Sequence, residues 1–421
     1  MHASNRTSTT DTSPSRIMML SIVGVDQPGI TSTVADILSQ YSASVLDIGQ
    51  AVIHSYLNLG MLISLAPSTN LDALKNEISV ALHALDNRVV FESIPLKSYT
   101  QWAAQQDKPR HIVTLLARQV NATHIAALMQ VAFAHGLNVD YIKRLSGPIG
   151  LAATSRQTKS SIEFSAQGRP GDIAALRRAF MALTAEHDID IAVQEESIFR
   201  RNRRLVCFDM DSTLIETEVI NELALEAGVG EQVAAITEAA MSGEIDFNQS
   251  FSQRMALLKG LDASVLAAVA ARLPLTEGVE HLFKVLNHLG YKTAILSGGF
   301  DYFARYLQAK LGINYIYANT LDIEQGQLTG KVVGNVVNGE RKAALLQELA
   351  AREKISLQQV VAVGDGANDL PMLSLAGLGI AFRAKPLVKT SAEQSISQLG
   401  LDAILYLMGL SDRDMACLNS P

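Results

Sequence analysis

The chain has 421 residues, more than one ordinary domain holds, so we expect two or three domains. Hydrophobic residues make up 48% and charged residues 18%, which is typical of a globular protein with a well-filled core. The net charge of −7 argues against a nucleic-acid-binding surface, and no apolar run approaches the roughly 18 residues that would span a membrane. The two cysteines, Cys207 and Cys417, lack the spacing of metal ligands or of a disulfide framework. We therefore expect a cytoplasmic protein.

The first half of the chain contains two copies of one pattern. Residues 1–15 are rich in Ser and Thr and predict a disordered tail before the first copy. Apolar runs predict strands, and apolar residues at helical spacing predict helices, in the order βαββαβ of a ferredoxin-like unit. We place the copies at 16–98 and 110–198, with a linker at 98–110. The expected strands are 17–25, 44–54, 57–65 and 89–95, then 111–117, 138–145, 160–166 and 189–195.

Paired βαββαβ units resemble ACT domains, a family that binds amino acids and regulates metabolic enzymes. In the first copy, Asp26-Gln27-Pro28-Gly29 lies where that family has its ligand loop, so the resemblance implies an amino-acid effector near Asp26 and Gly29. A plain Pro-Gly turn explains the same residue types equally well. The second copy has Arg118-Gln119-Val120-Asn121 in that place, which favours a role in dimerisation or spacing. Because ACT-like units often pair with one another, we expect a homodimer.

The second half, from about residue 203 to 412, alternates apolar strands with helices and predicts a parallel α/β sheet. The basic run 200–204 before it is interpreted as a solvated linker. The strand 205–208 ends in Asp209-Met210-Asp211-Ser212-Thr213, and ligands bind beyond the carboxyl ends of such strands. A helix N-cap explains one acidic residue there, but not two. Two carboxylates so close together need a cation or a hydrogen-bond network, so the pair indicates a functional site.

Two later strands end in a similar way. The strand 292–296 runs into Ser297-Gly298-Gly299-Phe300, where backbone N–H groups can approach a phosphate closely. The strand 360–363 runs into Gly364-Asp365-Gly366-Ala367-Asn368-Asp369, which is again acidic and rich in glycine. Carboxylate oxygens without neighbouring His or Cys favour Mg²⁺ over zinc.

This order of motifs, with a lysine between the last two, resembles the haloacid dehalogenase superfamily and, within it, the phosphoserine phosphatase family. The resemblance implies that Asp209 is the nucleophile that becomes aspartyl-phosphate and that Asp211 is the general acid and base. It also implies that Asp209, Asp365 and the backbone carbonyl of Asp211 bind Mg²⁺, with Asp369 orienting these ligands from just behind.

The remaining site residues come from the same resemblance. Those expected to hold the phosphoryl group are Ser297, Gly298, Lys342 and Asn368. A helical cap at about 218–272 would cover the site. In this cap Glu218 would bind the ammonium of the substrate, Arg254 its carboxylate and Phe247 its apolar side.

The function that the resemblance implies is hydrolysis of O-phosphoserine to serine and phosphate, the last step of serine biosynthesis. Two alternatives remain open. One is a phosphatase or phosphotransferase for another small phosphate ester. The other is an amino-acid-sensing regulatory protein whose phosphatase half is inactive, against which stands the presence of every expected catalytic residue.

Overall fold

The computed structural model describes residues 16–104, 108–150, 158–241, 245–416 and 418. The predicted disordered tail, 1–15, and Cys417 lie outside the described residues. The chain divides into two compact units, 1–108 and 109–421, and each is described by itself. Among the described residues, no helix has both the length and the apolar content needed to cross a membrane.

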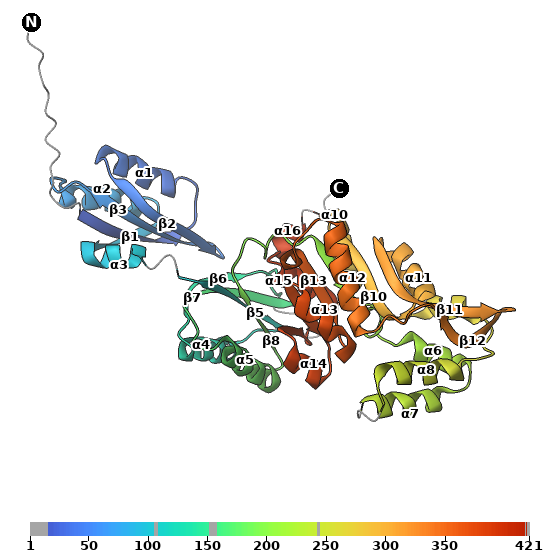
Figure 1. Cartoon of the computed structure of the whole chain (residues 1–421). Helices are drawn as coiled ribbons and strands as arrows, with labels where there is room; N and C mark the ends of the chain where they lie inside the picture. The colour runs from blue at the N-terminus through green and yellow to red at the C-terminus, as the bar shows by residue number, and fades with distance from the viewer. Residues whose placement is uncertain (1–15, 105–107, 151–157, 242–244, 417, 419–421) are drawn as a thin grey trace, which may run out of the picture. The chain divides into compact units, whose positions relative to one another are not determined.

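The first unit contains an antiparallel sheet with strand order β2-β3-β1-β4 and two helices on one face (Figure 1). Alternate residues of the central strands, such as Leu20 and Ile22, are buried against Val34 and Ile78 of the helices. The opposite face stays more exposed, as the alternating pattern predicts. The bounds are β1 Arg16–Val25, α1 Ile30–Gln40, β2 Ser44–Ile53, β3 Tyr56–Leu65, α2 Leu71–His83 and β4 Asn87–Ile94.

The predicted linker at 98–110 is in part a helix. Helix α3 covers Leu96–Ala104, and none of its residues is buried. Tyr99 and Trp102 lie on neighbouring turns, and their ring centroids are 5.8 Å apart. The sequence predicted a linker here without a helix in it, because the polar composition gave no helical signal.

The second unit begins with the second βαββαβ copy, whose sheet has the order β6-β7-β5-β8. Both faces of strands β5, β7 and β8 are largely buried, whereas the edge strand β6 is exposed. Val113 and Leu115 of β5 pack under helices α4 and α5, whereas Leu116 joins the core of the α/β domain that follows. The bounds are β5 Arg110–Ala117, α4 Ala122–Ala134, β6 Asn138–Arg144, β7 Ser160–Gln167, α5 Ile173–His187 and β8 Asp190–Glu195.

The basic run at 200–204 is not a solvated linker throughout. Arg200 is only 2% exposed, and its guanidinium forms an ion pair with the buried carboxylate of Glu163 on β7. Arg203 is also buried and donates to the backbone carbonyl of Gln358. Burial of these charges depends on partners far away in the sequence, so the run of basic residues alone predicted the wrong environment.

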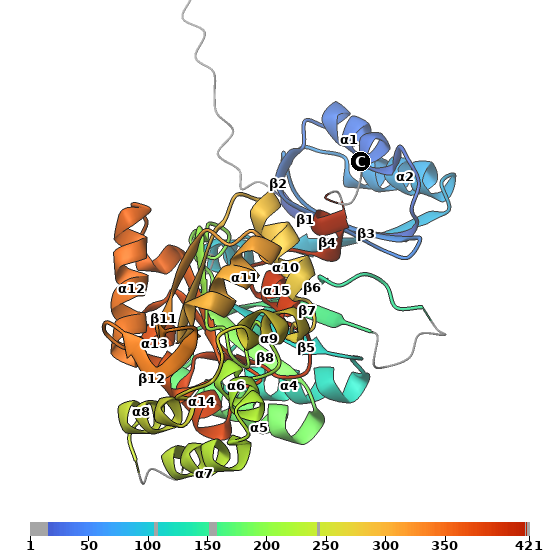
Figure 2. The same ribbon diagram turned by 90° about the vertical axis from the view of Figure 1, so that its right-hand side faces the viewer.

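The α/β domain has a seven-stranded sheet with the order β12-β11-β10-β9-β13-β14-β15. All neighbours are parallel except the β11–β12 hairpin. Strand β9 lies in the centre, with Val206 and Phe208 in the core on one side and Leu205 and Cys207 in the core on the other. Figure 2 shows α12 and α13 on one side of the sheet and α10 and α11 on the other.

The strand bounds are β9 Leu205–Phe208, β10 Lys292–Phe300, β11 Tyr315–Glu324, β12 Gln327–Val333, β13 Val360–Gly364, β14 Leu378–Phe382 and β15 Gln394–Ile396. The helix bounds are α10 Val279–His288, α11 Asp301–Leu311, α12 Gly339–Arg352, α13 Leu370–Leu375, α14 Pro386–Ser391, α15 Ile404–Leu407 and α16 Asp412–Ala416. Short 3₁₀ turns cover Leu357–Gln359, Ala367–Asp369 and Leu401–Ala403.

Between β9 and α10 the chain inserts helices, of which α6, α7 and α8 lie together beside the sheet (Figure 1). They are α6 Val219–Glu226, α7 Gly230–Met241, α8 Phe247–Leu257 and α9 Val265–Arg272. This insertion is the predicted helical cap. The predicted fold class, an α/β core with a helical cap preceded by two α+β ferredoxin-like units, is confirmed.

Candidate active site

Three adjacent strands deliver the sequence motifs to one edge of the sheet. Strand β9 lies between β10 and β13, and all three are parallel. Phe208 is in register with Ile295 of β10 and Val363 of β13, so Asp209 leaves the sheet between the two glycine-rich segments. The backbone N–H of Asp209 donates to the carbonyl of Val363 at 2.9 Å, which fixes the start of this loop.

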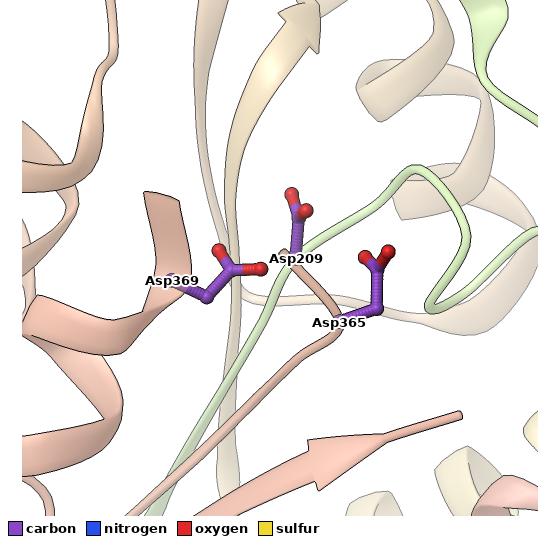
Figure 3. Close-up of side chains that lie close together, drawn as sticks. All are labelled: Asp209, Asp365 and Asp369. Atoms are coloured by element: carbon purple, nitrogen blue, oxygen red, sulfur yellow. The ribbon is translucent and has the colours of Figure 1, made fainter. Parts of the chain in front are cut away.

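Three carboxylates meet at this edge. Asp209, Asp365 and Asp369 each offer an oxygen, and these oxygens all lie within 4.8 Å of one another. Figure 3 shows the three side chains close together, Asp209 from the segment after β9 and Asp365 and Asp369 from the segment after β13. Burial and the charges of Asp209 and Asp369 raise the pKa of Asp365 to about 8. Burial and the charge of Asp209 likewise raise the pKa of Asp369 to about 6.

Two causes act together in these raised pKa values, since burial removes the water that stabilises a charged carboxylate and neighbouring charges add repulsion. Ionised carboxylates repel one another in a poorly solvated site, so each carboxyl binds its proton more tightly. A divalent cation between the oxygens would remove this repulsion, and a set of oxygen-only donors suits a hard cation. The cluster therefore fits a metal such as the one predicted from the sequence.

Lys342 partly neutralises the cluster. It lies in the first turns of α12, is fully buried, and extends its Nζ to Asp209 at 2.9 Å and to Asp369 at 2.6 Å. Burial alone would lower the pKa of Lys342, but the two carboxylates outweigh burial and raise it, so the side chain stays charged. Its full burial distinguishes Lys342 from an ordinary surface lysine.

Asp211 lies beside the cluster in a different environment. Its Oδ1 accepts a hydrogen bond of 3.1 Å from the backbone N–H of Val219, at the entry to the cap. Burial and the negative charge of Asp209 raise the pKa of Asp211 well above its usual range, which favours the protonated acid. The next residue, Ser212, has a left-handed backbone with φ of 56°, a conformation that costs energy outside glycine.

The glycine-rich segment of β10 approaches this carboxylate closely. A Cβ on Gly299 would lie 2.7 Å from Oδ2 of Asp211, so only glycine fits without a shift. Ser297 is buried, and its Oγ accepts a 2.9 Å hydrogen bond from the N–H of Gly299. The structure thus brings Ser297 and Gly298 to the edge where Asp209 lies.

Asn319 on β11 supports this segment, and the sequence motifs did not reveal it. Its Nδ2 donates to the carbonyl of Gly298 at 2.8 Å, and its Oδ1 accepts from the N–H of Val337 at 2.9 Å. Asn319 therefore ties the glycine-rich loop to the segment that leads into Lys342. An asparagine inside a strand with a buried side chain is a weak signal that could have pointed to it.

The predicted substrate residues lie on the cap and beside it. Arg254 is only 9% exposed, and its Nη1 lies 3.5 Å from Oε2 of Glu218. Its Nε has no hydrogen-bond partner among the described residues. Asn368 is half-buried in the turn beside Gly366. Phe247 begins α8, and its side chain lies outside what the structure describes.

The candidate effector loop in the first unit is exposed. Gly29 has a φ of 103°, which suits glycine, and directly precedes α1 without a side-chain cap. The backbone N–H of Asp26 donates to the carbonyl of Ser55 at 2.8 Å. These features are compatible with both the ligand loop and the plain turn considered for this sequence.

Comparison with known proteins agrees with this architecture. Residues 203–377 match the family of haloacid dehalogenase-like hydrolases, and residues 16–92 and 109–194 match two ACT domain families. A phosphoserine phosphatase from Mycobacterium tuberculosis is 36% identical over 94% of this chain and 93% of its own length. The chain belongs to the phosphoserine phosphatase family. It is therefore an enzyme, and its catalytic half is a hydrolase of the haloacid dehalogenase type.

Other phosphoserine phosphatases support the assignment. One from Streptomyces coelicolor is 38% identical over 97% of this chain and 96% of its own length. Among solved structures, a haloacid dehalogenase family hydrolase from Salmonella enterica serovar Typhi matches with a TM-score of 0.60 and 32% identity, covering 71% of this chain and 98% of that one. A probable phosphoserine phosphatase from Vibrio cholerae matches with a TM-score of 0.55 and 31% identity, covering 71% and 86%.

Proposed function

We propose that the protein hydrolyses O-phosphoserine to serine and phosphate, the reaction for which its relatives are named. The observation that carries the substrate assignment is the pairing of Glu218 with the largely buried Arg254 beside Asp211. A carboxylate and a guanidinium side by side complement the ammonium and carboxylate of an amino acid. A phosphate ester without these charged groups would add no partner to this pair, in which the Nε of Arg254 has no hydrogen-bond partner among the described residues.

The chemistry follows from the environments of the two aspartates. An oxygen of Asp209 attacks phosphorus, the bond to the serine oxygen breaks, and the proton of Asp211 passes to that oxygen. Asp211 then accepts a proton from the attacking water, and cleavage of the aspartyl-phosphate releases phosphate. The raised pKa of Asp211 supports this role, because the acid must hold its proton until the serine oxygen leaves.

Lys342, Ser297 and the backbone of Gly298 would hold the phosphoryl oxygens. Transfer of a phosphoryl group is accelerated mainly by positioning and by positive charge. Lys342 supplies a fixed charge that is already held by Asp209 and Asp369, so it needs no rearrangement during the reaction.

We assign Mg²⁺ as the cofactor. Asp209, Asp365 and the carbonyl of Asp211 would hold the ion, and Asp369 would orient them. Bound there, Mg²⁺ would offset the repulsion between the nucleophile and the phosphate. Dialysis against a chelator should abolish phosphate release, and added Mg²⁺ should restore it and raise the melting temperature. Full activity in the chelated protein would contradict the assignment.

Substrate choice should depend on Arg254. Replacing it with alanine should lower kcat/KM for O-phosphoserine by about 10- to 100-fold, because a charge-assisted hydrogen-bonding partner of the carboxylate is lost. The kcat/KM for phosphoethanolamine, which lacks the carboxylate, should fall much less. Steady-state kinetics with both esters measures the difference, and Arg305→Ala, on the exposed face of α11, is a matched control. An equal loss for both esters would contradict the role of Arg254.

We further propose that an amino acid binds the exposed loop around Asp26 and Gly29 and changes the activity. Calorimetric titration of the full chain with serine should give heat that Asp26→Ala abolishes. Asp36→Ala, on the exposed face of α1, should leave the heat unchanged. Titrations with serine and other amino acids that give no heat would contradict this proposal.

We also propose a homodimer and a cytoplasmic location. Strand β2 is an edge of its sheet and exposes the apolar side chains of Val45, Ile48 and Val52, which is the kind of edge that pairs with another chain. Sedimentation velocity measures the oligomeric state, and a monomer at micromolar concentration would contradict the dimer.

A further inference from the structure

The cap joins the α/β domain through two short chain segments that lie side by side. Ile215 on the way into the cap forms an antiparallel bridge with Leu275 on the way out. The backbone N–H of Glu216 donates to the carbonyl of Pro274 at 2.9 Å. Glu218, the proposed ligand of the substrate ammonium, follows two residues later. Any shift of this paired segment therefore moves Glu218 as well.

We call the paired segments around Ile215 and Leu275 the hinge. Positively and negatively charged side chains alternate around it. Both Nη atoms of Arg118 contact the Glu277 carboxylate, at 2.8 and 2.6 Å, and Nη2 of Arg383 contacts it at 3.0 Å. Nη1 of Arg383 lies 3.7 Å from Oε1 of Glu216. The hydrogen bonds from Arg118 lower the pKa of Glu277, so this carboxylate stays charged at neutral pH. We call Arg118, Glu277, Arg383 and Glu216 the hinge clamp.

One end of the hinge clamp belongs to the second ACT domain. Arg118 lies in the loop between β5 and α4, the same place that the candidate effector loop 26–29 occupies between β1 and α1. Its backbone carbonyl accepts a 2.6 Å hydrogen bond from Oγ1 of Thr158, which holds the loop. The corresponding loop of the first copy is exposed, whereas this one contacts the phosphatase hinge.

The other arginine is also held firmly. Arg383 follows β14 directly, and its backbone adopts a left-handed conformation with φ of 44°. Its N–H donates to the carbonyl of Ile396 at 2.7 Å, which stabilises this conformation. A non-glycine residue in this region is strained, and such strain persists only where the surroundings fix it. The guanidinium is thereby kept between Glu216 and Glu277.

We propose that Arg118 of the second ACT domain, together with Arg383, acts as a positioning residue for substrate binding. The two arginines fix Glu277 and Glu216 at the hinge, and the hinge sets the place of Glu218 opposite Arg254. In place of the loop that is proposed to bind an amino acid in the first copy, the second copy thus has a contact with the catalytic domain. This inference rests on the proposed role of Glu218 in binding the ammonium of the substrate.

Kinetics of the full chain test this proposal. Arg118→Ala should raise KM for O-phosphoserine about fivefold, in keeping with loss of a partly exposed ion pair, and should change kcat by less than about twofold. For p-nitrophenyl phosphate, which has no ammonium, both KM and kcat should change by less than about twofold. Arg118→Lys keeps the charge but not both hydrogen bonds, and its KM should lie between those of the wild type and Arg118→Ala.

A matched control separates the hinge clamp from general loosening of the second ACT domain. Arg177 on α5 forms another ion pair with the phosphatase domain, 3.3 Å from Glu393, and neither residue belongs to the hinge clamp. Arg177→Ala should leave KM unchanged. An equal rise of KM in both variants, or no rise in Arg118→Ala, would overturn the hinge clamp. A wild-type protein that is inactive on O-phosphoserine but active on another ester would instead contradict the proposed function.

Discussion

Replacement of Asp209 by asparagine should reduce phosphate release by about a thousandfold or more, because an amide cannot form the aspartyl-phosphate. The protein should still fold. Asp209 contributes to the raised pKa values of Asp365, Asp369 and Asp211, so its removal takes one negative charge out of a crowded site. Rates measured by release of inorganic phosphate, with the melting temperature beside them, would show loss of activity without loss of structure.

The control for this substitution is Asp301→Asn. Asp301 begins α11 and contacts Arg305 at 3.5 Å and the Oγ1 of Thr320 at 3.2 Å, both outside the carboxylate cluster, so its replacement should leave the rate almost unchanged. Substantial activity in Asp209→Asn would contradict the assignment of the nucleophile. Trapping of a phosphorylated protein in the wild type but not in Asp209→Asn would support it.

Replacement of Lys342 by methionine should have the second large effect. Methionine keeps most of the apolar stem but removes a buried charge that contacts Asp209 and Asp369. Removing one partner of a buried ion pair costs about 3–5 kcal/mol of stability, since the remaining charges are left uncompensated. We expect a lower free energy of unfolding and a loss of phosphate release by about a hundredfold or more.

Chemical denaturation with and without Mg²⁺ separates the two consequences of this change. Mg²⁺ should restore part of the lost stability, because it also compensates the charge of the carboxylates. It should not restore the activity. Lys310→Met is the control, since Lys310 is partly exposed and lies 3.9 Å from Glu280. A Lys342→Met protein as stable and active as the wild type would show that the lysine does not hold the cluster together.

Much of the site could be predicted from the sequence because its residues follow apolar strands directly. The end of a parallel strand is fixed by the strand itself, so Asp209, Ser297 and Asp365 had to lie along one edge. Lys342 was harder, because a helix surface does not reveal which lysine is buried. Only the resemblance to a family singled it out.

Other features depend on contacts that no local pattern encodes. Arg200 is buried because Glu163 lies opposite it, and Asn319 holds Gly298 from a neighbouring strand. Arg118 contacts Glu277, which is 159 residues away in the chain. The burial of both faces of β5, β7 and β8 in the second ACT domain could not be predicted either, since the phosphatase domain replaces solvent on one face.

The central claim is tested most directly by one measurement, phosphate release from a set of small phosphate esters with and without Mg²⁺. We expect Mg²⁺-dependent release with the highest kcat/KM for O-phosphoserine, ahead of phosphoethanolamine and sugar phosphates. A preference for sugar phosphates would contradict the substrate assignment. Equal rates in the presence of a chelator would contradict the metal-dependent mechanism at Asp209.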